Sequence, residues 1–222
     1  MRRILVLSVS FACLGFGLSP GHAHPHEFID TGITFRFDDR GQLGAIGVVW
    51  AWDELTSMLI VEDMEMDTDG DGELNGDELQ RLRDHFGRWP DDFGGDLYVK
   101  QGGKAVTLSG PLDVQAEYRG NRVIISHLRA LPQRLNPETA PVIVQAYDPA
   151  YYAVYDLVET PGIRGREGCS VTIREADIAA AQKRYDQLLG QLTEEEIMEE
   201  GKYPEVGDAF ADEVRIECDK RE

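Results

Sequence analysis

The sequence has few cysteines and few basic residues. It contains three cysteines, and Cys13 lies in an apolar N-terminal run, so Cys169 and Cys218 are the two in the rest of the chain. Lys and Arg number 22 against 41 Asp and Glu, which gives a formal charge of −19. Such an acidic surface repels nucleic acid and anionic lipid, so we expect no nucleic-acid partner. The sequence also lacks a Ser/His/Asp or Cys/His arrangement, and we therefore do not expect an enzyme.

Long apolar stretches are also absent, with one exception near the start. Residues 4–18 are apolar, follow the positively charged start Met1–Arg3, and are short for a membrane span. The small residues in "GHA" then suit a signal-peptidase site after Ala23, although a cut after Gly21 is the alternative. We predict a signal peptide over 1–23, a mature chain from His24, and no membrane span in the mature protein.

Two cysteines remain after this processing. An even number of cysteines in an exported chain favours a disulfide, here between Cys169 and Cys218. Two free, buried thiols are the alternative. Zinc binding at the cysteines is disfavoured because no histidine lies near either of them in the sequence.

Most of the mature chain shows the alternation of β-strands. In residues 33–37, Ile33, Phe35 and Phe37 alternate with polar residues, and an acidic turn leads to a second strand over 43–52. Further strands are expected in the ranges 96–100, 105–109, 112–119, 122–128, 141–148, 152–159, 169–175 and 213–218. The pattern predicts an α+β fold, a single domain over 24–222 with a mostly antiparallel β-domain and a C-terminal helix over 176–192.

A helix–loop–helix insertion is predicted at about 53–90. Asp53 is suited to cap the first helix, in which Leu55, Met58, Leu59 and Glu62 fall on one stripe. The second helix runs from about residue 76 towards Pro90. We expect Trp50 and Trp52, at the end of the preceding strand, to pack these helices onto the sheet.

The loop of this insertion, "DTDGDGELNGDE" at 67–78, has the spacing of an EF-hand calcium loop. Glycine stands at the sixth position, where the chain must turn with positive φ, and Leu74 supplies the apolar anchor. The predicted Ca²⁺ ligands are Asp67, Asp69, Asp71, Glu73 through its backbone carbonyl, Asn75 and Glu78. A single extracellular loop of this kind binds weakly, roughly at 10⁻⁴–10⁻³ M, so a structural role is expected. The alternative is an acidic surface turn that matches by chance.

Three histidines stand within five residues in "GHAHPHEFID". Cleavage after Ala23 would place the α-amine and imidazole of His24 beside His26, and nitrogen ligands suit Zn²⁺, Cu²⁺ or Ni²⁺. In a strand that begins by His26, Asp30 would share its face, and His127 is a further candidate ligand. The alternative is a signal-peptide junction that has histidines by chance. Among the remaining candidates, Tyr147, Tyr151, Tyr152 and Tyr155 are expected to pack a strand and its turn, with a ligand-binding surface as the alternative.

Four segments together resemble an uncharacterised family of bacterial periplasmic proteins, described as periplasmic components of an ABC-type transport system. They are "HAHPHEFID", "WAWDELTS", "DTDGDGELNGDE" and "YDPAYYAVY", in this order between residues 22 and 155. The resemblance implies a periplasmic location, an association with zinc or nickel/cobalt transport, and a functional role for His24, His26 and Asp30.

We therefore expect a non-enzymatic, periplasmic metal-binding protein. It would capture or deliver a transition metal, with zinc favoured, for a membrane metal transporter, and the calcium loop would be structural. Two alternatives remain open: a calcium-stabilised β-domain that binds a protein partner, and a copper-dependent enzyme whose N-terminal histidine would form a copper brace.

Overall fold

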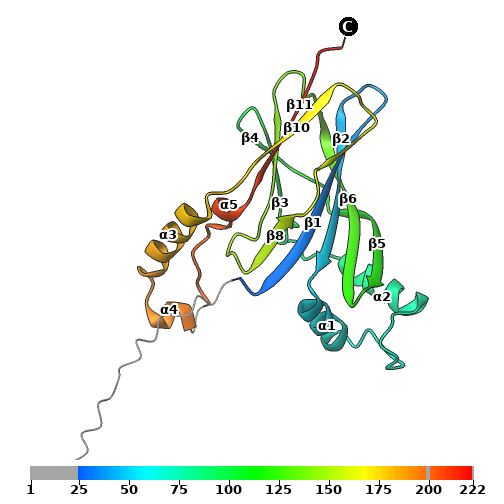
Figure 1. The fold of residues 1–222 in the computed structure, drawn as a ribbon, viewed down its shortest axis with the longest axis vertical. Coiled ribbons are helices and arrows are strands. Elements are labelled where there is room, and N and C mark those ends of the chain that lie inside the picture. The colour runs from blue at the N-terminus through cyan, green and yellow to red at the C-terminus, as the bar shows by residue number, and fades with distance from the viewer. Residues whose placement is uncertain (1–24, 199–200, 222) are drawn as a thin grey trace, which may run out of the picture.

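The structure, a computed structural model, describes residues 25–198 and 201–221 (Figure 1). The predicted signal peptide and His24 lie outside the described residues. The strands form two sheets, one in the order β5-β6-β2-β1-β8, with β9 also paired to β1, and one in the order β10-β11-β7-β3-β4. Buried side chains from both sheets meet in one hydrophobic core. This arrangement confirms the predicted α+β fold.

The first sheet is built on the predicted hairpin of β1 and β2. Every second residue of β1 from Ile29 to Phe35 is buried, as the alternation predicted. The buried residues are Ile29, Thr31, Ile33 and Phe35. The Asp38 carboxylate accepts the backbone N–H groups of Arg40 and Gln42 and so closes the turn. Strands β8 and β9 run parallel to β1. The strands are β1 (Glu27–Phe37), β2 (Leu43–Trp52), β5 (Pro111–Arg119), β6 (Arg122–Leu135), β8 (Ala153–Leu157) and β9 (Gly162–Arg164).

The second sheet consists of β3 (Leu97–Gln101), β4 (Lys104–Val106), β7 (Val142–Ala146), β10 (Cys169–Arg174) and β11 (Glu213–Cys218). Gly102 and Gly103 form the turn between β3 and β4, both with positive φ, as a two-residue hairpin turn of type I′ requires. Cys169 and Cys218 are direct partners across β10 and β11 and are joined by a disulfide, which confirms the predicted bond.

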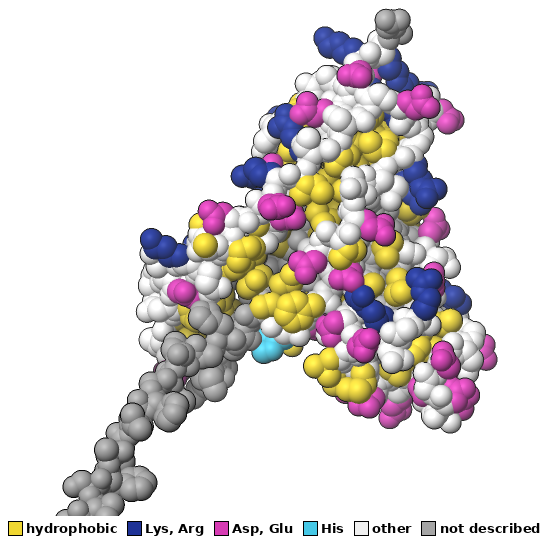
Figure 2. Space-filling model, in the orientation of Figure 1, with side chains coloured by type: hydrophobic (Ala, Val, Ile, Leu, Met, Phe, Trp, Pro, Cys, Tyr) yellow, Lys and Arg dark blue, Asp and Glu magenta, His cyan; other side chains and the backbone are white. Residues whose placement is uncertain are grey.

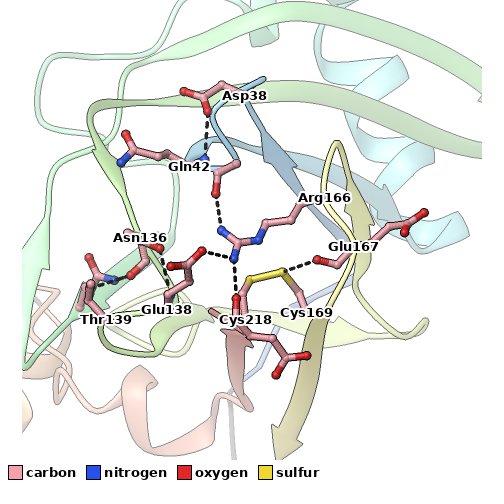
Figure 3. A network of polar contacts seen from close by, with 12 residues as sticks. Asp38, Gln42, Asn136, Glu138, Thr139, Arg166, Glu167, Cys169 and Cys218 are labelled. Carbon is pink, nitrogen blue, oxygen red and sulfur yellow. Dashed lines mark hydrogen bonds and ion pairs between the residues drawn. A yellow bond between two sulfur atoms is a disulfide. The ribbon is translucent and has the colours of Figure 1, made fainter. Parts of the chain in front are cut away.

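A polar network lies beside the disulfide (Figure 3). The guanidinium of Arg166, whose side chain is 3% exposed, donates to the Glu138 carboxylate at 2.6 Å, to Asp219 O at 2.9 Å and to Gly41 O. These acceptors belong to the β1–β2 turn, the segment before β7 and the segment after β11. Arg166 therefore joins three parts of the chain at the end that carries the disulfide.

Helices α1 (Glu54–Asp63) and α2 (Gly76–Phe86) follow β2, as predicted, and α3 (Ile178–Leu189), α4 (Glu194–Met198) and α5 (Gly207–Phe210) precede β11. Asp53 caps α1 by accepting the N–H groups of Leu55 and Thr56. Trp52 contacts Phe86 of α2, with ring centroids 5.0 Å apart, which confirms that it packs the insertion. In the described part of the chain, no helix is long and apolar enough to cross a membrane.

The apolar stripe expected on α1 is not the face that packs. Leu55, Met58 and Leu59 are 64%, 45% and 46% exposed, whereas Ser57 is fully buried. The Ser57 hydroxyl donates to Trp52 O and accepts the N–H of Val123 at 2.9 Å. These hydrogen bonds join the first turn of α1 to the end of β2 and the start of β6. Ile60 and Val61 also pack against the core, so the packing face of α1 differs from the predicted stripe.

Candidate metal sites

The loop between α1 and α2 has the local geometry that the spacing predicted. Gly72, at the sixth position, has a φ of +82°, a conformation that an L side chain rarely adopts. Asn75 caps α2, and its Oδ1 accepts the N–H groups of Asp77 and Glu78. The Glu78 carboxylate in turn accepts the Asn75 N–H at 2.9 Å and completes a capping box.

Three of the predicted calcium ligands come together in this loop. One carboxylate oxygen from each of Asp67, Asp69 and Asp71 lies within 4.8 Å of the others. A backbone hydrogen bond from Asp71 lowers the pKa of Asp69, but burial and the charges of Asp71, Glu78 and Asp67 outweigh it, so the pKa of Asp69 is raised. The three carboxylates therefore repel one another, and a bound cation would relieve this repulsion.

The other predicted calcium residues are arranged differently. Glu78 is 2% exposed, and its Oε1 accepts the N–H of Thr68 at 2.7 Å and also the Thr68 hydroxyl. These hydrogen bonds, with the one from Asn75, lower the pKa of Glu78 and keep it ionised. The Glu78 carboxylate thus bonds Thr68 near the start of the loop and Asn75 near its end, and it is not grouped with the three aspartates. Glu73 is exposed, as expected for a residue that contributes a backbone carbonyl.

The predicted transition-metal residues are spread over several places. His24 lies outside the described residues, and the exposed His26 precedes β1, where its N–H donates to Tyr152 O at 2.8 Å. Asp30 forms an ion pair of 2.7 Å with Arg122. His127 is buried in the core and packs against Trp50, with ring centroids 4.6 Å apart.

The structure does not bring Asp30 and His127 together. On β1 Asp30 alternates with the buried Ile29, whereas His127 is itself on the buried face of β6, so the two side chains lie on opposite faces of the sheet. Burial and Arg129 lower the pKa of His127 to about 3, and His127 is therefore neutral at physiological pH. Its two ring nitrogens have no hydrogen-bond partner among the described residues. Its edge-on contacts with Trp50 and Trp89 are consistent with an N–H donating to an aromatic face.

Segments that are distant in the sequence meet beside His26. The Asp53 N–H donates to Phe28 O at 3.0 Å, so the start of α1 lies against the start of β1. Asp148 holds the turn before β8, because its Oδ2 accepts the N–H groups of Tyr152 and Ala153 at 2.7 and 3.1 Å. The "PHEFID", "WAWDELTS" and "YDPAYY" segments therefore meet at one end of the first sheet.

Two acidic residues at this end of the sheet, Asp96 and Glu27, were not predicted from the sequence. Asp96, which follows Gly94 and Gly95, accepts a hydrogen bond of 2.7 Å from the Tyr155 hydroxyl. Burial raises the pKa of Asp96 to about 6 and also raises the pKa of Glu27 at the start of β1. A single aspartate after two glycines belongs to no recognisable motif, so the sequence pattern could not identify Asp96 as a site residue. The tyrosine run mainly packs, as expected, since Tyr147 stacks on Tyr98 and Tyr151 on Phe210.

The fold and the loop define an α+β protein of two sheets with an EF-hand-like helix–loop–helix after the second strand. The chain belongs to the family described as "Protein of unknown function (DUF1007)", whose family model matches residues 9–218. No curated protein and no solved structure matches the chain. The disulfide between Cys169 and Cys218 suits a protein that resides outside the cytoplasm.

Proposed function

We propose that this is an exported metal-binding protein in which the loop 67–78 binds one Ca²⁺ ion. The observation that carries this proposal is the convergence of Asp67, Asp69 and Asp71, with carboxylate oxygens within 4.8 Å of one another. Hard oxygen ligands at this spacing suit Ca²⁺ and do not suit softer metals. The acidic surface of the end that carries α1 and α2 would attract the cation (Figure 2).

The role proposed for calcium is structural. The loop connects α1 and α2, and α2 packs through the fully buried Leu82. An ion would cancel the repulsion among the three aspartates and fix the two helices relative to each other. Glu78 would complete the shell by exchanging its hydrogen bonds from Thr68 for the ion, while the Asn75 N–H stays bonded to its other oxygen.

Calcium is expected to raise the stability of the wild type. With a dissociation constant of roughly 10⁻⁴–10⁻³ M, about 10 mM Ca²⁺ adds about 1.4–2.7 kcal/mol to the free energy of unfolding. For a domain of this size that corresponds to a rise in melting temperature of about 3–10 °C. Thermal unfolding followed by circular dichroism, with Mg²⁺ in parallel, measures this shift.

Two variants make the test specific to the loop. Glu78→Gln keeps the capping box, because glutamine also serves at that position, but it loses the charge that binds the ion. It should lose most of the shift. Glu73→Gln changes the charge equally at a residue that contributes its backbone carbonyl, and it should keep the shift. A calcium effect of equal size in both variants would place the bound ion elsewhere.

A second function is proposed for the N-terminus, namely the capture or delivery of a transition metal, with zinc favoured, for a membrane metal transporter in the periplasm. Its support is that His26 is exposed at the very start of β1, where the three segments meet, and that His24 stands two residues before it. After cleavage, the amine and imidazole of His24 would chelate the metal together with His26. Asp30, which is bound to Arg122, would act at most by orienting this end of the strand.

This second proposal predicts that a free amine on His24 is required. Protein that begins at His24 should bind Zn²⁺ more tightly than a form with one added N-terminal alanine, on the order of 10–100-fold, the loss typical of a metal site deprived of a supporting group. His26→Ala should also weaken binding, whereas the exposed His85→Ala should not. Calorimetric titration compares these forms. Equal affinity with and without the added alanine would rule out the amine as a ligand.

A further inference from the structure

A cavity of about 660 Å³ is bounded by the start of β1, the end of β2, strand β8 and the segment that follows α2. This volume is within the usual range of small-molecule sites, roughly 300–1,000 Å³. Its walls are largely aromatic and are formed by Trp50, Trp52, Phe86, Trp89, Phe93 and Tyr155. They include all three tryptophans of the chain.

The cavity is also acidic. Glu27, Asp96 and Asp148 line it, and Asp96 experiences the charges of the other two. The Tyr155 hydroxyl donates to one oxygen of Asp96, which fixes the carboxylate against the aromatic wall. Asp96 adopts a left-handed backbone conformation with a φ of +47°, and the chain maintains this uncommon geometry at the cavity.

Two arginines near these acids offset only part of their charge. The charge of Arg129 lowers the pKa of Asp96 and so partly compensates this carboxylate, although burial outweighs the effect. The N–H groups of Arg129 donate to Gly94 O, Gly95 O and Ser109 O, and its guanidinium stacks on Trp89 at 4.6 Å. Arg88 also lines the cavity, but its side chain is 81% exposed and faces Asp84 at 3.7 Å. The cavity therefore combines aromatic faces, which attract cations, with an excess of acidic residues, because Glu27, Asp92, Asp96 and Asp148 line it together with one arginine.

The distribution of the acids indicates the kind of cation. In the part of the chain that the structure describes, the one group of three acidic or metal-ligating side chains close enough to hold a bare ion is Asp67, Asp69 and Asp71. The carboxylates of Glu27, Asp96 and Asp148 are thus spread around the cavity. Such spacing suits a cation with an apolar body of its own, which contacts the aromatic walls while its charge faces the acids.

We propose that this cavity binds a small organic cation, an amine or a quaternary ammonium compound, with Asp96 as the principal anionic partner. Trp52 and Phe93 would provide aromatic surface for the apolar body. This inference is independent of the calcium loop, because none of Asp67, Asp69, Asp71 and Glu78 lines the cavity.

Choline and its neutral isostere 3,3-dimethylbutan-1-ol test the inference, because they differ in charge and little in shape. Binding is followed by intrinsic tryptophan fluorescence in buffer that contains Ca²⁺ and no transition metal. Choline should change the fluorescence saturably and bind at least about tenfold more tightly than the alcohol. Asp96→Asn should weaken choline binding at least about tenfold. Asp91→Asn removes the same charge from an exposed residue outside the cavity lining, and it should bind choline like the wild type.

Thermal unfolding of both variants checks that they are folded. Equal binding of choline and the alcohol would show an apolar cavity without charge recognition and would overturn the proposal. Equal binding of choline by the wild type and Asp96→Asn would overturn the role of Asp96. The absence of saturable binding up to about 50 mM choline, far weaker than the micromolar to millimolar range of specific sites, would overturn the site.

Discussion

Loss of the disulfide is expected to lower the free energy of unfolding by about 4 kcal/mol, the chain-entropy value for a closed loop of this length. Cys169 and Cys218 are 49 residues apart in the sequence and are direct partners across β10 and β11. The bond restrains the unfolded chain over α3, α4 and α5. The double variant Cys169→Ala/Cys218→Ala, compared with the wild type by urea unfolding without reductant, measures the effect.

The reduced wild type provides the matched control. It should unfold at the same urea concentration as the double variant, since both lack the cross-link. The ion pair of Arg166 with Glu138 beside the bond is retained in both forms and does not contribute to the difference (Figure 3). A loss below about 1 kcal/mol would show that the denatured chain is already restrained in this region.

Replacement of Asp96 by asparagine is expected to stabilise the protein at neutral pH. Burial raises the pKa of Asp96 from 3.8 to about 6, and each unit corresponds to about 1.36 kcal/mol, so the upper estimate of the gain is roughly 3 kcal/mol. Asparagine keeps an oxygen that accepts the Tyr155 hydroxyl, and it tolerates the left-handed backbone at this position. The variant therefore removes the buried charge with little other change.

The pH dependence gives the sign of this effect. Between pH 3.8 and about 6, the native state holds a proton on Asp96 that the unfolded state has released, so the stability of the wild type falls as pH rises through this window. The difference between Asp96→Asn and the wild type should be near zero below pH 3.8 and largest above about pH 6. Urea unfolding at several pH values measures it, with Asp91→Asn as the control. A pH-independent difference would mean that the pKa of Asp96 is not raised.

A stability cost at Asp96 has a functional implication. A buried acid that destabilises the native state at neutral pH is typical of binding and active sites, where such groups serve a ligand. Once measured, this cost would support, together with the aromatic walls of the cavity, a role for Asp96 in recognition of a cation.

The features that the sequence predicted well are those set by local patterns. Alternation identified the β1–β2 hairpin, and ligand spacing placed a glycine with positive φ at position 72 of an acidic loop. The number of cysteines and the expected export of the chain together predicted the disulfide. Each of these depends on residues close in sequence or on one simple count, so no knowledge of the tertiary arrangement was needed.

The features that it did not predict depend on contacts between distant residues. Asp96 and Tyr155 are 59 residues apart, and their hydrogen bond joins the segment before β3 to β8 of the other sheet. The separation of Asp30 from His127 follows from the register of β1, β2 and β6, which periodicity within each strand does not fix. On α1, Ser57 bonds to β2 and β6 while Ile60 and Val61 pack against the core, so the packing face differs from the predicted stripe.

The central claim, that the loop 67–78 binds calcium, is tested most directly by calorimetric titration of Ca²⁺ into the protein. We expect saturation at about one ion per chain with a dissociation constant of roughly 10⁻⁴–10⁻³ M, loss of binding in Glu78→Gln and retention in Glu73→Gln. The absence of binding in the folded wild type at about 10 mM Ca²⁺, well above that range, would contradict the claim. So would unchanged binding in Glu78→Gln.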